Sequence, residues 1–327
     1  MRKILALAAL FAILTARNLF AQEQPCPSPV NFAGIRTFLS APYVPHLEDL
    51  KADIAVVGVP FDEGTWNAPG TRYGPRELRE GTAMYKMCDL SLGFYYIEGD
   101  RVILKGKHWA DVGDVETWPT VPAQTNDSVT RTIRSILAKK AVPVVLGGDH
   151  SITFPVLRAY DVPLTLIHFD AHLDTWTGAP GNLDHASWVN RAAKLPNVKK
   201  IIQIGMRGLA NDLEARDNVR KINSTIITSE QIHRRGVEWA LSQVPKSESI
   251  YVTVDVDVMD PAVAPGTGTL EPGGLSFFQL DDLLTGLGAK GHLVGLDVVE
   301  VDDRDHSGRT AQTGVRLIID LLGAALH

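Results

Sequence analysis

Short apolar runs with the character of β-strands alternate with segments of helical pattern along almost the whole chain. This alternation predicts a mostly parallel sheet with helices on both of its faces. Two of the runs, Ile54–Val59 and Val142–Leu146, are apolar at nearly every position, as is typical of central strands covered on both sides. Because the composition shows no break along the chain, we expect one α/β domain, a three-layer αβα sandwich with about eight strands.

No internal repeat and no long linker interrupts this order, and we expect residues 33–327 to form the single domain, preceded by an extended, polar arm at 22–32. The expected strands are Ile54–Val59, Val142–Leu146, Leu164–Phe169, Lys200–Ile204, Thr225–Thr228, Ile250–Val256 and His292–Val299. The helical or partly helical segments are Pro75–Tyr85, Thr125–Lys139, Ile152–Ala159, His185–Leu195, Leu209–Lys221, Ser229–Leu241, Ser276–Gly288 and Gly308–Leu322.

The composition excludes several classes of protein. The chain has 327 residues, 45% of them hydrophobic and 21% charged, which is ordinary for a globular protein and unlike collagen or a disordered chain. Cys26 and Cys88 are too few for a disulfide scaffold, and whether the two pair stays open. The net charge of -6 and the lack of basic stripes argue against a nucleic-acid partner.

The N-terminus has the layout of a secretory signal. The basic Met1-Arg2-Lys3 precedes the apolar run Ile4–Leu14, which is shorter than the ~20 residues of a membrane span. We expect residues 1–21 to be removed by cleavage after Ala21, with Ala16 as the second candidate position. The mature protein is then exported, either periplasmic or secreted, without a membrane partner. An uncleaved anchor or an ordinary amphipathic helix is the alternative.

Polar, ionisable segments follow three of the apolar strands at the point where each strand ends. They are Gly147-Gly148-Asp149-His150-Ser151, Asp170-Ala171-His172-Leu173-Asp174 and Asp255-Val256-Asp257-Val258-Met259-Asp260-Pro261. In a parallel α/β sheet the ligand site lies beyond the carboxyl ends of the strands, so these segments are expected to meet at one edge. The alternate spacing of Asp170, His172 and Asp174 directs three candidate ligands to one face.

Together the three segments supply four carboxylates and two imidazoles as candidate metal ligands: His150, Asp170, His172, Asp174, Asp255 and Asp257. Four carboxylates buried close together repel one another and are costly to desolvate, and a pair of divalent cations removes that cost. Carboxylate and imidazole ligands without a thiolate favour Mn²⁺, with Ni²⁺, Fe²⁺ or Zn²⁺ left open. Each segment alone fits a helix cap, a tight turn or a buried histidine, but the three together do not.

The three segments, in this order and spacing, resemble the signature motifs of the ureohydrolase (arginase/agmatinase) family. The resemblance covers almost everything from about Ala33 to the C-terminus and is closest to the agmatinase branch. Further matching segments are Gly58-Val59-Pro60-Phe61-Asp62, Pro69-Gly70-Thr71-Arg72-Tyr73-Gly74-Pro75, Asp111-Val112-Gly113-Asp114, Pro265-Gly266-Thr267-Gly268-Thr269 and Gly295-Leu296-Asp297-Val298-Val299-Glu300-Val301. It implies an arginase-like fold, two Mn²⁺ per chain and a homo-oligomer, commonly a trimer or hexamer.

The resemblance also implies a role for each ligand. One ion is held by His150, Asp170, Asp174 and Asp255, and the other by Asp170, His172, Asp255 and Asp257. A hydroxide bridging the ions attacks the guanidinium carbon, and the tetrahedral intermediate collapses to urea and an amine. Asp257 orients this hydroxide or takes its proton.

Two further catalytic and substrate-binding residues follow from the same resemblance. Glu300 pairs with the guanidinium group, because a carboxylate matches its planar array of donors. His185 passes a proton to the leaving amine. The family's His-Gly-Thr/Ser pattern reads His185-Ala186-Ser187 here. The ordinary alternatives are a surface salt bridge for Glu300 and a plain loop histidine for His185.

The segments that read the substrate tail are the least constrained part of the sequence. Where arginases carry a carboxylate-binding Asn this chain has Trp176, which argues against arginine. Pro265–Ser276 and Thr65–Tyr73 resemble the agmatinase branch. Trp176 or Trp66 is a candidate to face an alkylammonium group through a cation–π contact, with simple packing as the alternative. We expect agmatine to be hydrolysed to putrescine and urea, with guanidinobutyrate, guanidinopropionate and free guanidine left open and arginine less favoured.

Two other classes of function deserve comparison. Deacetylases that bind a single Zn²⁺ resemble the same fold but lack the full two-metal ligand set, so six intact ligands argue against them. An inactive, secreted binding homologue is the non-enzyme alternative. Loss of a ligand would favour it, and none is lost.

Overall fold

The computed structural model describes residues 34–85, 89–179, 181–303 and 306–326. The chain divides into the units Met1–Ile35 and Arg36–His327, and the fold lies within the second. Its centre is an eight-stranded sheet in which every neighbouring pair is parallel, in the order β4-β1-β5-β10-β9-β6-β7-β8. The strands are β1 (Ile54–Gly58), β4 (Trp109–Asp114), β5 (Val142–Leu146), β6 (Leu164–Phe169), β7 (Val198–Met206), β8 (Thr225–Thr228), β9 (Ser249–Asp255) and β10 (His292–Val299).

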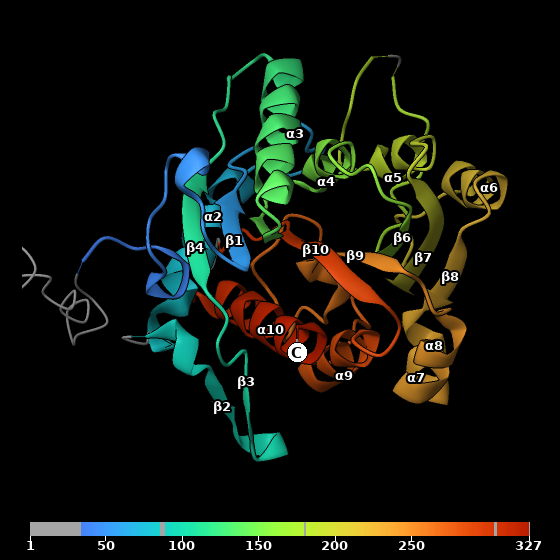
Figure 1. Cartoon of the computed structure of the whole chain (residues 1–327). Helices are drawn as coiled ribbons and strands as arrows, with labels where there is room; N and C mark the ends of the chain where they lie inside the picture. Colours follow the sequence, from blue (N-terminus) through green and yellow to red (C-terminus); the bar gives the residue numbers. More distant parts are fainter. Residues whose placement is uncertain (1–33, 86–88, 180, 304–305, 327) are drawn as a thin grey trace, which may run out of the picture. The chain divides into compact units, whose positions relative to one another are not determined.

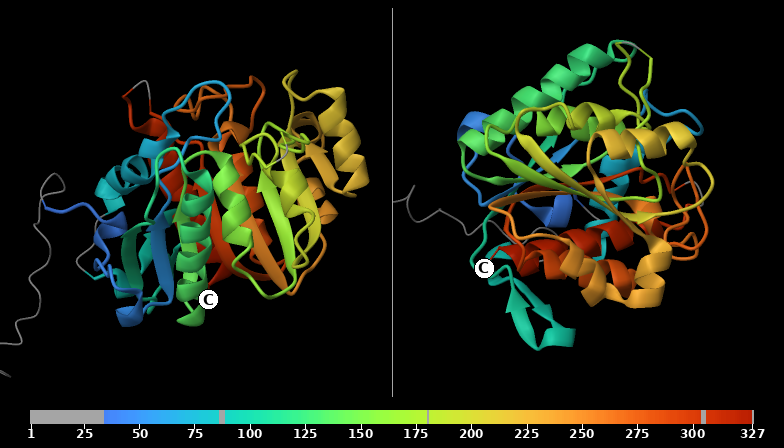
Figure 2. Two further views of the ribbon diagram at one scale, coloured as in Figure 1. Left: turned by 90° about the horizontal axis from the view of Figure 1, so that it is seen from above. Right: turned by 90° about the vertical axis from the view of Figure 1, so that its right-hand side faces the viewer.

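Helices cover both faces of this sheet, as Figures 1 and 2 show. On one face lie α3 (Pro122–Ala138), α4 (Thr153–Leu157) and α5 (Trp188–Ala192), with α6 (Leu213–Lys221) beside β7. On the other lie α2 (Gly74–Gly81), α7 (Ser229–Arg235), α8 (Val237–Gln243), α9 (Phe277–Leu287) and α10 (Arg309–Ala325). The prediction of a three-layer αβα sandwich is confirmed.

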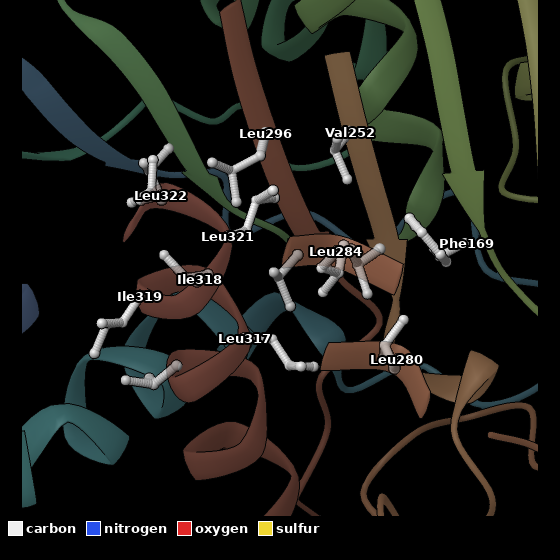
Figure 3. Packing of buried hydrophobic residues seen from close by; sticks show 14 of the residues in the cluster. Phe169, Val252, Leu280, Leu284, Leu296, Leu317, Ile318, Ile319, Leu321 and Leu322 are labelled. Atoms are coloured by element: carbon white, nitrogen blue, oxygen red, sulfur yellow. The ribbon is translucent and has the colours of Figure 1, made fainter. Parts of the chain in front are cut away.

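Alternation along the strands builds two hydrophobic cores. In β1, Ile54 and Val56 join the core under α9 and α10, whereas Ala55 and Val57 join the core under α3 and α4. This is the period-2 geometry of a strand buried on both sides. Figure 3 shows the first core, in which Leu284 of α9 packs among strand and α10 side chains. A fully buried Leu or Val of this kind contributes about 2 kcal/mol of transfer free energy.

The order of the strands places the site. The strands β5, β10, β9 and β6 are consecutive neighbours at the centre of the sheet, although β10 is the last strand of the chain. Phe169 pairs in register with Val254, and Val299 with Asp255. The residues that follow these strands therefore emerge side by side at one edge of the sheet.

The structure departs from the predicted elements in three places. The strand β4, at the edge of the sheet, was not expected, because the two aspartates and the glycine in its sequence do not form the apolar pattern of a buried strand. Its Asp111 is buried and accepts hydrogen bonds from Arg79 Nε at 2.8 Å and Nη2 at 3.0 Å. An antiparallel hairpin of β2 (Phe94–Tyr96) and β3 (Arg101–Ile103) was also not expected. The predicted helix Ser229–Leu241 is two helices, because Gly236 adopts a φ of 89° between them.

Several predictions fall on parts of the chain outside the described residues. These are the signal segment 1–21, its cleavage position, the arm at 22–32 and the state of Cys26 and Cys88. Within the described ranges, no helix combines the length and the apolar character needed to cross a membrane.

Candidate metal centre

The six predicted metal ligands come together at the carboxyl edge of the central strands. Asp170 directly follows β6, and Asp255 is the last residue of β9. His150 opens the one-turn 3₁₀ helix His150–Ile152 after β5, and Asp257 lies in the turn Val256–Val258 after β9. All of these are buried. The local reason is that β5, β6 and β9 are buried almost throughout and end at one edge, so that the polar residues at or just after their carboxyl ends are delivered at the rim.

His150 forms the centre of the first group. Its Nδ1 atom lies 3.0 Å from Asp170 Oδ2, 3.3 Å from Asp255 Oδ2 and 3.4 Å from Asp174 Oδ2. This nitrogen is buried, yet no acceptor or donor meets it with hydrogen-bond geometry. A ring nitrogen surrounded in this way by three carboxylate oxygens fits a cation placed among them.

His172 forms the second group. Its Nδ1 atom lies 3.0 Å from Asp257 Oδ2 and 3.4 Å from Asp170 Oδ1. Asp170 thus faces His150 with one oxygen and His172 with the other. Its ligand atoms belong to two sets that are compact enough for a metal ion, one with His150, His168 and Asp174 and one with His172 and Asp257. Asp170 is therefore the carboxylate placed to bridge two ions.

The electrostatics of the cluster call for added positive charge. Burial, together with the charges of Asp257 and Asp170, raises the pKa of Asp255 well above its ordinary value. Burial and the charge of Asp170 do the same to the pKa of Asp174. Burial opposes a charge on the His150 ring, but Asp170 and Asp255 outweigh it and raise the pKa of His150. Divalent cations would remove the repulsion that drives these shifts, so the residues present fit a two-metal centre.

A buried chain of hydrogen bonds lies behind His150 and was not predicted from the sequence. Its Nε2 atom lies 2.8 Å from the hydroxyl of Thr253, and that hydroxyl donates to Asp297. Asp297 also accepts from Tyr251 at 2.7 Å and from Thr153 at 3.0 Å. Because the Thr253 proton goes to Asp297, Nε2 of His150 carries the ring proton and leaves Nδ1 bare for a metal.

His168 supports Asp170 in a similar way. Gln203 Nε2 donates to His168 Nδ1 at 3.1 Å, so His168 Nε2 carries the proton and lies 2.7 Å from Asp170 Oδ2. Burial lowers the pKa of His168, which keeps the ring neutral. His168, Thr253 and Asp297 were not predicted. The sequence offered one signal for them, because each is a polar residue inside an otherwise largely apolar strand. His168 and Thr253 each lie two positions before a rim residue, Asp170 and Asp255, whereas Asp297 lies three positions before Glu300.

Glu300 and His185 meet beside the cluster, as predicted. Glu300 directly follows β10, is 2% exposed, and accepts the backbone N–H of His150 at 2.9 Å. His185 Nδ1 lies 3.1 Å from Glu300 Oε1, and His185 Nε2 accepts the backbone N–H of Trp66 at 3.1 Å. Burial opposes charge on the ring, but Glu300 prevails and raises the pKa of His185 to about 9.

The backbone at two of these positions is unusual. Asp174 has a φ of 50° and Glu300 a φ of 62°, in the left-handed region that non-glycine residues rarely adopt. Such conformations cost of order 1 kcal/mol or more and cluster at functional sites. The surrounding contacts hold both, including the hydrogen bond from Trp188 Nε1 to Asp174 Oδ2 at 2.8 Å.

A cavity of about 210 Å³ opens onto this cluster. Its lining consists of Trp66, Asn67, His172, Asp174, Trp176, His185, Ala186, Ala210, Asn211, Asp255, Thr269 and Glu300. Asn211 and Thr269 are among the lining residues that were not predicted as site residues from the sequence. Asn211 accepts the backbone N–H of Leu173 at 2.8 Å, and Thr269 donates to Asp257 Oδ2 at 3.0 Å. Both lie in loops whose approach to the cluster is set only by the fold.

Comparisons with known proteins agree with this arrangement. The model of the Arginase family matches residues 52–323. The agmatinase of Chromobacterium violaceum is 33% identical over 303 residues, covering 89% of this chain and 88% of the relative. The guanidinopropionase of Pseudomonas aeruginosa is 36% identical over 305 residues, covering 89% and 92%. The solved structure of proclavaminate amidino hydrolase from Streptomyces clavuligerus matches with a TM-score of 0.81 at 30% identity, covering 90% of this chain and 98% of that one.

Proposed function

Because the chain belongs to the arginase family, and to its agmatinase-like part, we propose that it hydrolyses agmatine to putrescine and urea. At the coarser level, it is a binuclear-metal amidinohydrolase that acts on a guanidino compound. Agmatine as the substrate is our proposal, since relatives with similar sequence identity to this chain are named agmatinase, guanidinopropionase and guanidinobutyrase.

The observation that carries the proposal is the shared position of Asp170. It presents one oxygen to the His150 group and the other to the His172 group, while Glu300 and Asp255 line the same cavity. Two candidate cation sites that share Asp170 thus lie next to Glu300, a carboxylate that lines the cavity and is held through its Oε1 atom by His150 and His185.

The metal ligands in this proposal are His150, Asp170, His172, Asp174, Asp255 and Asp257. Two divalent cations bound there would offset the carboxylate charge and lower the pKa of a water molecule towards neutrality. We propose Mn²⁺ as these ions, because the donors are carboxylates and imidazoles without a thiolate.

The remaining steps belong to side chains of this chain. Glu300 holds the guanidinium group, and its own position is held by the backbone N–H of His150. Asp257 accepts a proton from the attacking water as the oxygen adds to the guanidinium carbon. Burial opposes a charge on the His185 ring, but Glu300 raises its pKa to about 9, and it is the protonated ring that gives a proton to the nitrogen of the leaving amine. The hydrogen bond that Nε2 accepts from the Trp66 N–H belongs to the neutral ring. The two transfers balance, so that urea and a protonated amine leave.

The character of the cavity supports an amine-bearing tail. Among the described residues that line it there is no Lys or Arg to receive a carboxylate. The 36% identity to a guanidinopropionase supports a guanidino acid as the second candidate. Trp176 lies in the lining, which supports its predicted role at the substrate tail.

A substrate panel tests the proposal. Protein loaded with Mn²⁺, and separately with Ni²⁺, is assayed for urea from agmatine, arginine, 4-guanidinobutyrate, 3-guanidinopropionate and guanidine. We expect agmatine to give the highest kcat/KM. Glu300→Gln is expected to lose turnover, while the matched control Glu238→Gln, an exposed glutamate on α8, keeps it. Absence of urea from every compound would refute the function, and a preference for another compound would refute the substrate.

Two further properties are proposed from the sequence and have direct tests. Export with removal of residues 1–21 predicts a mature N-terminus near Gln22, measurable by mass spectrometry of protein purified from its native compartment. A homo-oligomer, trimer or hexamer, predicts a multiple of the chain mass in light scattering.

A further inference from the structure

The wall of the cavity runs from a buried floor to an open mouth. The Glu300 side chain at the floor is 2% exposed, and the His185 side chain beside it is 12% exposed. Trp66 follows, with its ring centroid 6.4 Å from that of His185, and is 51% exposed. A guanidinium group held by Glu300 therefore directs its tail past His185 towards Trp66.

Two tryptophans stand together at that mouth. The rings of Trp66 and Trp176 are 4.6 Å apart at an interplanar angle of 72°, and both line the cavity. An edge-to-face pair of this kind presents the electron-rich face of at least one indole to its surroundings. Indole faces attract alkylammonium groups and offer nothing to a carboxylate.

The loop that carries Trp66 is held in place by hydrogen bonds to the site. Gly64 N donates to Asp149 Oδ2 at 2.8 Å, and Gly64 O accepts the backbone N–H of His185 at 3.1 Å. The backbone N–H of Trp66 donates to His185 Nε2 at 3.1 Å. On the other side, Trp176 N donates to Ala186 O at 3.0 Å. Both rings are thus attached to backbone that the active site itself orders, which reduces the entropy lost when a ligand binds.

Among the described residues that line the cavity there is no Lys or Arg. Arg207 lies in the loop that leads to Ala210 and Asn211, but its guanidinium group donates to backbone carbonyls. These include Asp257 O and Glu271 O, both at 2.6 Å. Arg207 therefore fastens the loop of Asp257 and is committed to that role.

We infer that Trp66 and Trp176 form the specificity-determining surface of this enzyme, which selects a guanidine whose tail ends in an ammonium group over one that ends in a carboxylate. The inference rests on the proposed hydrolysis of a guanidino compound. The exposure gradient sets the direction of the tail, the paired indoles supply the attraction, and the absence of Lys and Arg from the described lining removes the partner of an acid.

The experiment uses three guanidines with four-carbon chains that differ at the far end: agmatine, butylguanidine and 4-guanidinobutyrate. Their kcat/KM values are measured with the Mn²⁺-loaded full chain and with Trp66→Leu, Trp176→Leu and Trp66→Phe. Phe278→Leu serves as the control, because Phe278 is 66% exposed on α9 and is not part of the cavity lining. The readout is the ratio of agmatine to butylguanidine, which a general loss of folding would leave unchanged.

We expect the order agmatine, butylguanidine, guanidinobutyrate in the unmodified enzyme. Trp66→Leu and Trp176→Leu should lower the ratio of agmatine to butylguanidine about threefold to thirtyfold, the range of a cation–π contact. Trp66→Phe should retain part of the ratio, and Phe278→Leu all of it. A ratio unchanged in both Leu variants, with agmatine still preferred, would overturn the inference alone. Urea formation with guanidinobutyrate preferred would overturn both the inference and agmatine as the substrate, but would leave the hydrolysis of a guanidino compound standing. Absence of urea from all three compounds would overturn the proposed function and the inference with it.

Discussion

Replacing Thr253 by valine is expected to weaken the metal site that contains His150 without opening the fold. The Thr253 hydroxyl is fully buried and lies between His150 Nε2 and Asp297. Valine has nearly the same shape but offers no hydrogen bond. The N–H of His150 then has no partner, and Asp297 keeps only the hydroxyls of Tyr251 and Thr153.

The size of the effect follows from these contacts. A buried donor left without a partner costs about 1–3 kcal/mol. The His150 ring can avoid that cost only by rotating or by moving its proton to Nδ1, and either change removes the nitrogen that faces the carboxylates. Loss of a partner behind a metal-ligating histidine costs roughly tenfold to a hundredfold in metal affinity. We therefore expect a weakening in that range for one of the two ions.

The assay is a calorimetric titration of the metal-free protein with Mn²⁺. Thr253→Val should show one weakened class of site and one that is nearly unchanged, because the Thr253 hydroxyl supports His150, whereas His172 faces Asp257 and Asp170. Thr253→Ser is the matched control. It keeps the hydroxyl and deletes one methyl group, so it should lose about 1 kcal/mol of folding stability but keep both affinities. Two unchanged affinities in the valine variant, with stability reduced as in the serine variant, would refute the reasoning.

Three further substitutions probe charge. Burial and the charge of Asp170 raise the pKa of Asp174, so Asp174→Asn should raise the melting temperature of the metal-free protein and reduce the further rise on adding Mn²⁺, as followed by calorimetry. Burial and Asp320 raise the pKa of Asp281 from 3.8 to about 7. Between those values the unfolded chain releases a proton that the folded chain keeps, so folding stability falls as the pH rises through this window. Asp281→Asn should then gain roughly 1–2 kcal/mol in urea unfolding at pH 8, after allowance for solvent screening, and nothing at pH 4. Arg79→Met leaves a buried carboxylate of β4 unpaired and should cost about 3–5 kcal/mol in urea unfolding.

Each of these expectations has an opposite result that would contradict it. Full Mn²⁺ stabilisation in Asp174→Asn would remove that residue from the ligand set. A gain in Asp281→Asn that is the same at pH 4 and pH 8 would mean that its charge is not the cause. For Arg79, the control is Arg76→Met on the same helix, an exposed residue paired with Glu80, whose loss should lower the stability much less because solvent screens that ion pair. Equal losses of unfolding free energy in Arg79→Met and Arg76→Met would show that the buried ion pair stabilises the fold no more than the exposed one.

The meeting of the candidate metal ligands was predictable because their placement is local. Asp170, His172 and Asp174 lie at alternate positions directly after β6, and a buried strand delivers the polar residues that follow its carboxyl end at the rim. The same reasoning located Asp255, which is the last residue of β9. Each of these predictions needs only the end of one strand and the rule that parallel strands end at one edge.

The parts that escaped prediction depend on contacts between distant segments. The strand β4 carries a charged Asp111, and only its pairing with Arg79 makes that charge tolerable inside the structure. The break between α7 and α8 at Gly236 was also missed. The sequence has a helical pattern on both sides of this glycine, and neither pattern indicates that the helix stops there.

The sequence by itself determined the fold class, the edge at which the site forms and the chemistry of its ligands, because hydrophobic period and strand ends are properties of short segments. Only the tertiary structure decided which strands are neighbours, and so placed β10 between β5 and β9 and Glu300 beside His150. It also decided what lies behind and above the ligands, namely Thr253 and Asp297 on one side and the Trp66–Trp176 pair on the other. Those contacts join residues that are far apart in the sequence, so no periodic pattern in a short segment predicts them. They form only when the pairing of the strands brings these residues together.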